Sequence, residues 1–148
     1  METKIKKNWQ GRVKDVEELH HDTLTWKSEI NFIIDEMHFL EHLLGSKFID
    51  LIHSGLYKKI ELLVNKITDE KNSGKVLIRL ILDQERILSN LIKNESDTSN
   101  ANFLEKHHKF EVEMVDYVKK YKRIKKQIFD IVEKVMKDKG QKKLIQKQ

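Results

Sequence analysis

Residues 19–44, with the sequence LHHDTLTWKSEINFIIDEMHFLEHLL, decide the fold of this chain. Apolar residues recur in this stretch in steps of three and four, which places them on one face of an α-helix. The stretch also contains four histidines and several carboxylates. It is therefore open to two interpretations: a helix that packs into a core, and a helix that presents ligands to a metal ion.

The apolar stripe continues beyond this stretch in both directions. It begins at Trp9 and runs on in the same phase to Ile52. Gly45 lies inside the run, but one glycine costs only about 1 kcal/mol in a helix interior. A Ser-Gly pair then provides a stop, with Gly55 as a left-handed cap. The pattern predicts one helix over residues 12–53.

A second apolar stripe runs from Leu56 to Leu91 in alternating steps of four and three, and it predicts a helix over about 56–94. The polar stretch 68–74 inside it has the composition of a loop. The apolar phase is nevertheless the same on both sides, so we expect the helix to run through it. The alternative is a break near residues 72–74, which would produce a four-helix bundle.

The third helix is separated from the second by Asn94–Asn102 (NESDTSNAN), a small and polar segment that is typical of a loop. After it, a stripe from Phe103 to Val135 predicts a helix over about 102–138. The first ten and last eight residues have little to bury, so we expect mobile termini.

The composition favours long helices in a single domain. The chain has 148 residues, no proline and only five glycines, whereas strand-rich folds need turn residues at regular intervals. Three helices of matched length with short connections predict an all-α fold, an elongated antiparallel up-down-up bundle in one domain over residues 1–148. The sustained heptad-like spacing is typical of coiled-coil packing.

Several function classes lack the residues that they need. The chain has no cysteine, which excludes a disulfide framework, a thiol nucleophile and a thiolate zinc site. It has no glycine-rich phosphate loop, and its serines form no Ser-His-Asp constellation. No apolar run reaches the length of a signal-peptide core or a membrane span, so a cytoplasmic protein is expected. The sequence thus favours a non-enzymatic protein.

The positive charge of the chain is concentrated at its C-terminal end. Residues 119–148 carry 12 basic and 3 acidic residues, whereas residues 1–118 carry 17 basic and 21 acidic residues. Such a basic pole, with the runs KKYKRIKK and KDKGQKK, attracts nucleic acid, anionic lipid or an acidic partner. The alternative is a solvated lysine-rich helix end, which also suits the helix dipole.

Histidines and glutamates near one end of the expected bundle form a candidate metal site. The antiparallel register places His20 opposite His107, with Glu85 and Glu111 about one turn further along. Helical bundles hold iron, manganese or zinc through carboxylate and imidazole groups on facing helices. The alternative is that the histidines are hydrogen-bonded core residues. The candidate ligands are His20, Glu85, His107, His108 and Glu111.

The known metal-binding bundles require more ligands than this chain offers. A ferritin-type site needs two Glu-x-x-His motifs and two further glutamates, and a hemerythrin-like site needs histidine motifs on successive helices. Here His38 and His42 form one His-x-x-x-His motif, but the register places it far from His107. Residues 56–94 contain no histidine. The pattern of either family is therefore incomplete.

One stretch of the first helix resembles a known group of proteins. It reads Leu19-His20, Trp26-x-x-Glu29-x-x-Phe32-x-x-Asp35-Glu36, Phe39-Leu40-x-x-Leu43-Leu44 and Phe48-Ile49-Asp50-Leu51. With this pattern, mainly over residues 19–51, the chain resembles a group of small uncharacterised bacterial α-helical-bundle proteins. The resemblance implies the architecture of three long helices and brings no known activity.

These observations lead to one main hypothesis and two alternatives. The main hypothesis is a non-enzymatic helical bundle without a cofactor that acts through protein–protein interaction, by self-association or by binding a partner helix. The first alternative is a metal-binding bundle that uses the histidine and glutamate layer. The weaker alternative is the binding of polyanions, including nucleic acid, through the basic pole.

Overall fold

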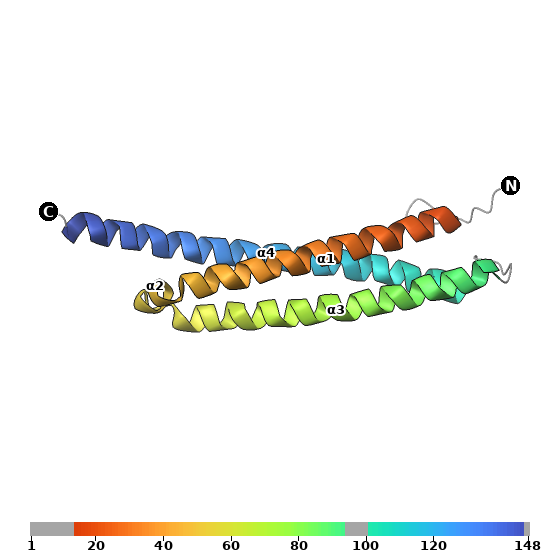
Figure 1. Ribbon diagram of the computed structural model, residues 1–148, viewed down its shortest axis with the longest axis horizontal. Coiled ribbons are helices and arrows are strands. Elements are labelled where there is room, and N and C mark those ends of the chain that lie inside the picture. Colours follow the sequence, from red (N-terminus) through yellow and green to blue (C-terminus); the bar gives the residue numbers. More distant parts are fainter. Residues whose placement is uncertain (1–13, 94–100, 147–148) are drawn as a thin grey trace. The chain divides into compact units, whose positions relative to one another are not determined.

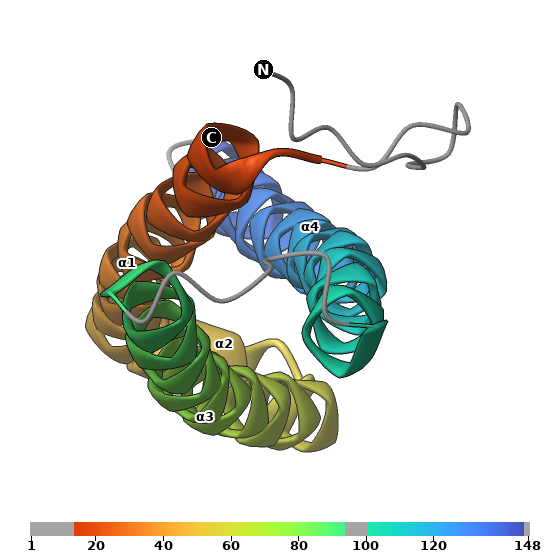
Figure 2. The ribbon, with the colours of Figure 1, turned by 90° about the vertical axis from the view of Figure 1, so that its right-hand side faces the viewer.

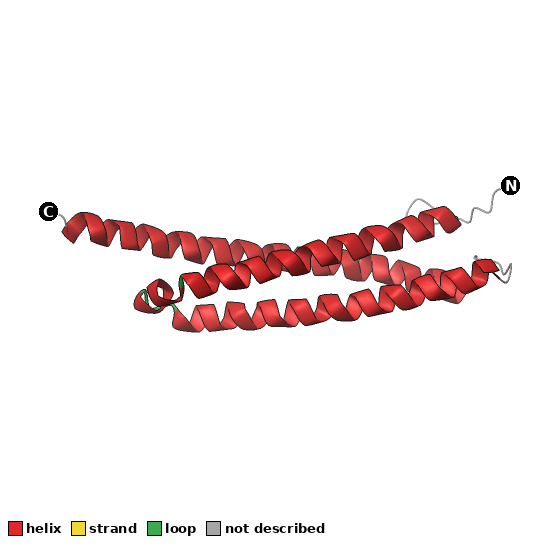
Figure 3. Cartoon of the chain, viewed as in Figure 1, coloured by secondary structure: helices red, strands yellow, loops and turns green. Residues whose placement is uncertain are grey.

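The computed structural model describes residues 14–93 and 101–146, and of residues 101 and 141–146 it describes the backbone alone. Within these residues there are four helices: α1 (Val16–Ser46), α2 (Phe48–His53), α3 (Tyr57–Lys93) and α4 (Ala101–Gln146) (Figure 1). The described ranges contain no strand (Figure 3), which confirms the all-α class. Most of the predicted loop at 94–102 and both extreme ends of the chain lie outside the described residues.

The structure corrects the helix predicted over 12–53 at both of its ends. Its first described residues are not helical, because the Asp15 carboxylate accepts a hydrogen bond of 2.9 Å from the Glu18 amide and caps a helix that begins at Val16. Its end is interrupted at Lys47, whose φ of −106° and ψ of 9° depart from helical values. The poor helix formers Gly45 and Ser46 precede this interruption.

The interruption at Lys47 changes which residues the stripe buries. The amide of Lys47 still donates to the Leu43 carbonyl at 3.2 Å, and the amide of Leu51 donates to the Lys47 carbonyl at 2.9 Å. The chain therefore bends without losing these hydrogen bonds. Leu51 remains buried beyond the bend, but Phe48 and Ile52 are 46% and 39% exposed.

The turn between α2 and α3 is the one that the sequence predicts. Gly55 has a φ of +79°, a left-handed conformation that glycine adopts without a steric penalty. Its amide donates to the carbonyl of Ile52 at 3.0 Å, and the Ser54 hydroxyl donates to that of Leu51 at 2.6 Å. These hydrogen bonds satisfy carbonyls at the end of α2 that have no partner inside the helix.

The other two predicted helices are continuous. α3 has no break at residues 72–74, so the alternative of a bundle split there is wrong, and the fourth helix arises instead from the bend at Lys47. α4 runs past Gly140 to Gln146, further than the predicted end at 138.

The buried residues follow the three predicted stripes. Each buried leucine or isoleucine contributes roughly 1.5–3 kcal/mol to folding. Four polar residues lie in the same stripes and are equally buried: Thr23, Glu70, Gln84 and His107. The apolar members of the core are Leu19, Trp26, Ile30, Ile33, Met37, Leu40, Leu44 and Leu51 before the turn, Ile60, Leu63, Ile67, Leu77, Ile81 and Leu88 on α3, and Phe103, Met114, Tyr117, Tyr121, Ile124, Ile128, Ile131 and Val135 on α4.

The contacts of the chain divide it into two units, each with its own part of this core. The first unit joins Met1–Phe32 to Gly74–Asp116, and the second joins Ile33–Ser73 to Tyr117–Gln148. In the first unit, the early turns of α1, the late turns of α3 and the early turns of α4 stand around a common centre (Figure 2). In the second unit, α1 with α2 and α4 run in the same direction, because Glu36–Lys125 and Asp50–Lys139 are both pairs of residues 89 positions apart.

Candidate functional site

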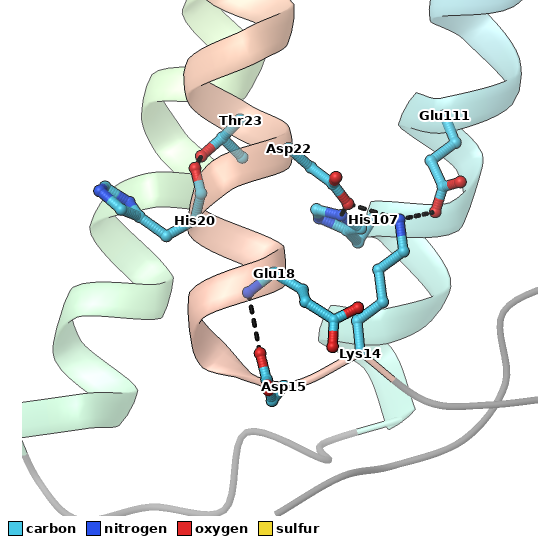
Figure 4. Close-up of polar contacts among 8 residues, drawn as sticks. All are labelled: Lys14, Asp15, Glu18, His20, Asp22, Thr23, His107 and Glu111. Atoms are coloured by element: carbon cyan, nitrogen blue, oxygen red, sulfur yellow. Dashed lines mark hydrogen bonds and ion pairs between the residues drawn. The ribbon is translucent and has the colours of Figure 1, made fainter.

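A cluster of charged side chains around a buried histidine lies in the first unit (Figure 4). Asp22 on α1 holds the cluster together through one oxygen. Its Oδ2 lies 2.9 Å from Nε2 of His107 on α4 and 2.6 Å from Nζ of Lys14, which precedes α1. The same Lys14 Nζ lies 3.4 Å from Oε1 of Glu111, one turn beyond His107. Two carboxylates, an imidazole and an ammonium group therefore converge.

His107 is packed among aromatic rings. Its side chain is 3% exposed, and its ring centroid lies 4.7 Å from that of Trp26 and 6.2 Å from that of Phe103. Because a carboxylate only accepts hydrogen bonds, the Nε2–H of His107 donates to Asp22. The other ring nitrogen, Nδ1, is buried and has no hydrogen-bond partner. The histidine is thus fixed in position by its stacking and by a single hydrogen bond.

The electrostatics of the cluster keep its ion pair charged. Burial alone would raise the pKa of Asp22, but the hydrogen bonds from His107 and Lys14 outweigh burial and lower it. Burial alone would lower the pKa of Lys14, but its interactions with Asp22 and Glu111 outweigh burial and raise it. Both groups are therefore ionised at neutral pH.

The structure brings together only part of the predicted ligand set. His107 and Glu111 lie in the cluster, whereas His20 is exposed and points away from Asp22 on α1 (Figure 4). Glu85 on α3 faces Lys27 instead, with Oε2 3.5 Å from its ammonium nitrogen. His108 is exposed.

Asp22 was missed because the expected register is about two residues off. The prediction paired His20 with His107, but the residue opposite His107 is Asp22, 85 positions earlier in the chain. Since neighbouring helix positions differ by about 100° in direction, this small error replaces an inward-facing residue by an exposed one. A signal was nonetheless present: acidic residues recur every fourteen positions at Asp22, Glu36 and Asp50.

In the second unit, the two later carboxylates of this series each meet a lysine of α4. Nζ of Lys125 lies 2.7 Å from Oε1 of Glu36, and Nζ of Lys139 lies 3.2 Å from Oδ2 of Asp50. The hydroxyl of Tyr121 donates to the same oxygen of Glu36. The hydrogen bonds from Lys125 and Tyr121 lower the pKa of Glu36, and burial with the nearby carboxylate raises that of Tyr121.

Glu111 departs from this pattern. It precedes Lys125 by fourteen positions, as Lys125 precedes Lys139, so it occupies the position in the series at which α4 otherwise carries a lysine. The carboxylate of Asp22 therefore faces a second carboxylate on α4. The compensating positive charge comes from outside that helix, from Lys14.

A third polar group in the second unit is poorly satisfied. Glu70 on α3 is 2% exposed, and its Oε2 has no hydrogen-bond partner, while Oε1 lies 3.5 Å from Nζ of Lys120. The buried hydroxyl of Tyr117 has no partner either. Burial raises the pKa of Glu70, and burial with the nearby Glu70 charge raises that of Tyr117. This layer costs stability rather than adding to it.

The second unit also contains a groove of about 380 Å³ between the start of α3 and α4. Its apolar lining includes Leu62, which is 55% exposed, and the buried Leu63 and Ile131. Three lysines border the groove, Lys59 and Lys66 from α3 and Lys134 from α4. Apolar side chains and three lysines thus line the same groove in this unit.

Comparison with known proteins returns no relative for this chain: no protein-family model, no curated protein and no solved structure matches it. The resemblance to small bacterial helical-bundle proteins therefore stays a prediction. Within residues 14–93 and 101–146, no helix is long and apolar enough to cross a membrane.

Proposed function

We propose that this protein acts by binding another protein, and that it receives an acidic amphipathic helix of that partner in the groove between α3 and α4. The observation that carries the proposal is the combination of an exposed Leu62 with three lysines around an apolar floor. Leu62 lies beside the apolar side chains of Leu56, Leu63 and Ile131 in this groove, so the apolar face of a bound helix would bury it there. We also propose that α1, α3 and α4 form the up-down-up bundle that the sequence predicts, beside which the partner helix would pack.

The length of the groove suits a helix. Its α3 side extends from Leu56 to Lys66, which corresponds to about 15 Å at a rise of 1.5 Å per residue. An amphipathic helix of about three turns covers this distance with apolar anchors at positions i, i+4 and i+7. Such a helix would bury Leu62 against its apolar face.

The charge of the groove selects an acidic partner. Lys59, Lys66 and Lys134 form no ion pair within the described residues, while Asp130, the one acidic residue in the lining, is already paired with Lys126 at 2.9 Å. Carboxylates on the flanks of the bound helix would complement these lysines and favour a single orientation. The terminal segments of this chain are basic and do not have this chemistry.

The basic pole supports polyanion binding less well than the groove supports helix binding. Within residues 119–140, five lysines form ion pairs with acidic residues of the same chain, so part of the positive charge is neutralised. Polyanion binding remains a prediction. Retention on heparin that falls steeply with salt concentration would support it.

The helix-binding proposal is tested with a fluorescent peptide of about 15 residues that places leucines on one face and glutamates on the other. Fluorescence anisotropy should show saturable binding to the protein, and a peptide of the same composition in scrambled order should not bind. Replacing the glutamates by lysines should abolish binding, because the groove is basic.

The matching protein variants are Leu62→Glu and Leu82→Glu. Both leucines lie on α3 and are similarly exposed, 55% and 45%, but only Leu62 lines the groove. We expect Leu62→Glu to weaken peptide binding on the order of tenfold or more, and Leu82→Glu to leave it unchanged. Equal effects of the two variants would refute the proposal. So would a dimer mass at micromolar concentration that Leu62→Glu abolishes, because a second copy would then fill the groove.

A further inference from the structure

We propose that Asp22, His107 and Glu111 form a binding site for a divalent transition-metal ion, and that the ammonium group of Lys14 occupies this site until the metal displaces it. The inference is independent of the helix-binding groove, because the cluster lies in the first unit and the groove lies in the second.

The ligand atoms of the three residues lie close together. One nitrogen or oxygen from each of the three residues lies within 4.8 Å of the other two. Two ligands at about 2.1 Å from a tetrahedral zinc ion lie about 3.4 Å apart, so the closest pair must separate slightly and the Glu111 carboxylate must move closer. Asp22 and His107 are already 2.9 Å apart, and the Glu111 side chain is 27% exposed and able to rotate toward them.

A cation already lies between the carboxylates of the cluster. Lys14 Nζ lies 2.6 Å from Asp22 and 3.4 Å from Glu111, on the side of the cluster that both carboxylates face (Figure 4). Two carboxylates and one ammonium leave one net negative charge beside the His107 imidazole. A divalent ion in place of the ammonium would neutralise both carboxylates.

The compensating positive charge of this cluster comes from outside α4. Where α4 supplies its own lysine, at Lys125 and Lys139, the ion pair is formed between two helices. At the position of Glu111 the helix supplies a second ligand oxygen instead, and the cation comes from a residue that precedes α1. Lys14 can therefore leave without disturbing the packing of α1 against α4.

His107 would supply the nitrogen ligand of the site. Its side chain is almost fully buried, and Nε2 points at the carboxylates, so it offers a prepositioned nitrogen ligand. Metal binding at Nε2 would move the ring proton to Nδ1, which has no partner. Nδ1 is equally unpaired before metal binding, so the buried polar atom exists in both states. An imidazole with two carboxylates suits a first-row transition ion of the zinc class better than Mg²⁺ or Ca²⁺.

The test measures Zn²⁺ binding by calorimetry in a background that carries His38→Gln and His42→Gln. This background removes a separate exposed His-x-x-x-His motif, since both histidines are exposed on α1. Replacing Lys14 by Met should tighten Zn²⁺ binding on the order of tenfold, because the competing charge is gone. Mg²⁺ should not bind measurably to either protein.

The ligand role is tested in the Lys14→Met protein. His107→Gln or Glu111→Gln should weaken Zn²⁺ binding on the order of 10- to 100-fold. His108→Gln is the matched control. His108 is the next residue after His107, but its imidazole is exposed, so this change should leave Zn²⁺ binding unaltered. With Co²⁺, the visible absorption of a low-symmetry site should appear in the Lys14→Met protein and disappear with Glu111→Gln, which changes a partly exposed residue and should preserve the fold.

Two results would overturn the inference. One is a Lys14→Met protein that binds Zn²⁺ no more tightly than the background. The other is an equal loss of binding from His108→Gln and His107→Gln, which would place the metal elsewhere. Circular dichroism of each variant establishes that the helices are intact, and the Glu111→Gln result decides the matter if His107→Gln unfolds.

Discussion

Tyr121 on α4 donates its hydroxyl hydrogen to the carboxylate of Glu36 on α1, a residue 85 positions earlier in the chain. Tyr121 is 3% exposed, so its hydroxyl has exchanged water for one charged acceptor. Hydrogen bonds to charged groups contribute more than neutral ones. This contact is therefore a specific polar link between two helices of the second unit.

Removing that hydroxyl should destabilise the protein. We expect Tyr121→Phe to lower the free energy of unfolding by about 2 kcal/mol in urea denaturation at neutral pH, since Glu36 loses a buried donor. Tyr117→Phe is the matched control: its hydroxyl is equally buried but has no partner. That variant should be neutral or slightly stabilising. A larger loss for Tyr117→Phe than for Tyr121→Phe would contradict the assignment.

Replacing the buried carboxylate of Glu70 should stabilise the protein. Glu70 is 2% exposed, and one of its oxygens has no hydrogen-bond partner. Glu70→Gln keeps the shape and removes the buried charge, so the free energy of unfolding at pH 7 should rise by about 1 kcal/mol. Because the pKa of Glu70 is raised in the folded state, ionisation of this side chain destabilises the folded state, and protonation at low pH removes that cost. The advantage of Glu70→Gln should therefore shrink as the pH is lowered toward 4.

Glu36 should show the opposite dependence on pH. Its pKa is lowered in the folded state, so its contribution is complete above the unfolded value of about 4.3 and is lost as the pH falls through the folded value. Glu36→Gln should therefore reduce the free energy of unfolding at pH 7 and have little effect near pH 2. Urea unfolding of both glutamate variants at several pH values gives two curves of opposite slope. Parallel curves would be incompatible with these environments.

The glycines that precede and follow α2, Gly45 and Gly55, should respond differently to substitution. Gly55 is left-handed, so Gly55→Ala should cost about 1 kcal/mol of unfolding free energy. Gly45 lies in α1, and no atom lies within 4 Å of the position of an added Cβ. Gly45→Ala should instead stabilise by about 0.5–1 kcal/mol, because alanine favours the helix. Thermal unfolding followed by circular dichroism measures both changes, and the two should have opposite signs.

The parts of the fold that depend on local periodicity were predictable from sequence. The spacing of residues such as Ile30, Ile81 and Ile128 fixes the inward face of each helix without any knowledge of its neighbours. The bend at Lys47 was not predictable, because apolar residues continue in phase across it and only Gly45 and Ser46 weaken the helix. Local propensity of that size rarely decides whether a helix continues.

The candidate site was predictable only in part, because it depends on how two helices are aligned along their length. His107 and Glu111 lie on one helix and were found together, since their spacing alone places them on one side. Asp22 comes from another helix, and Lys14 from outside any helix. The fourteen-residue spacing of Asp22, Glu36 and Asp50 marks acidic residues on α1 but does not by itself align them with α4, so the predicted register pairs His107 with His20 in place of Asp22.

Glu111 also bears on how the chain avoids folding in a wrong alignment. Fourteen residues are two heptads, so sliding α4 along α1 by that distance would keep apolar positions facing apolar positions. It would also bring Lys125 to Asp50, which is an acceptable pair. The same slip would set Glu111 against Glu36, and two carboxylates would then share a half-buried position. The native pair of Asp22 and Glu111 has Lys14 between its carboxylates, whereas the displaced pair would lack that cation, which makes the displaced alignment electrostatically unfavourable.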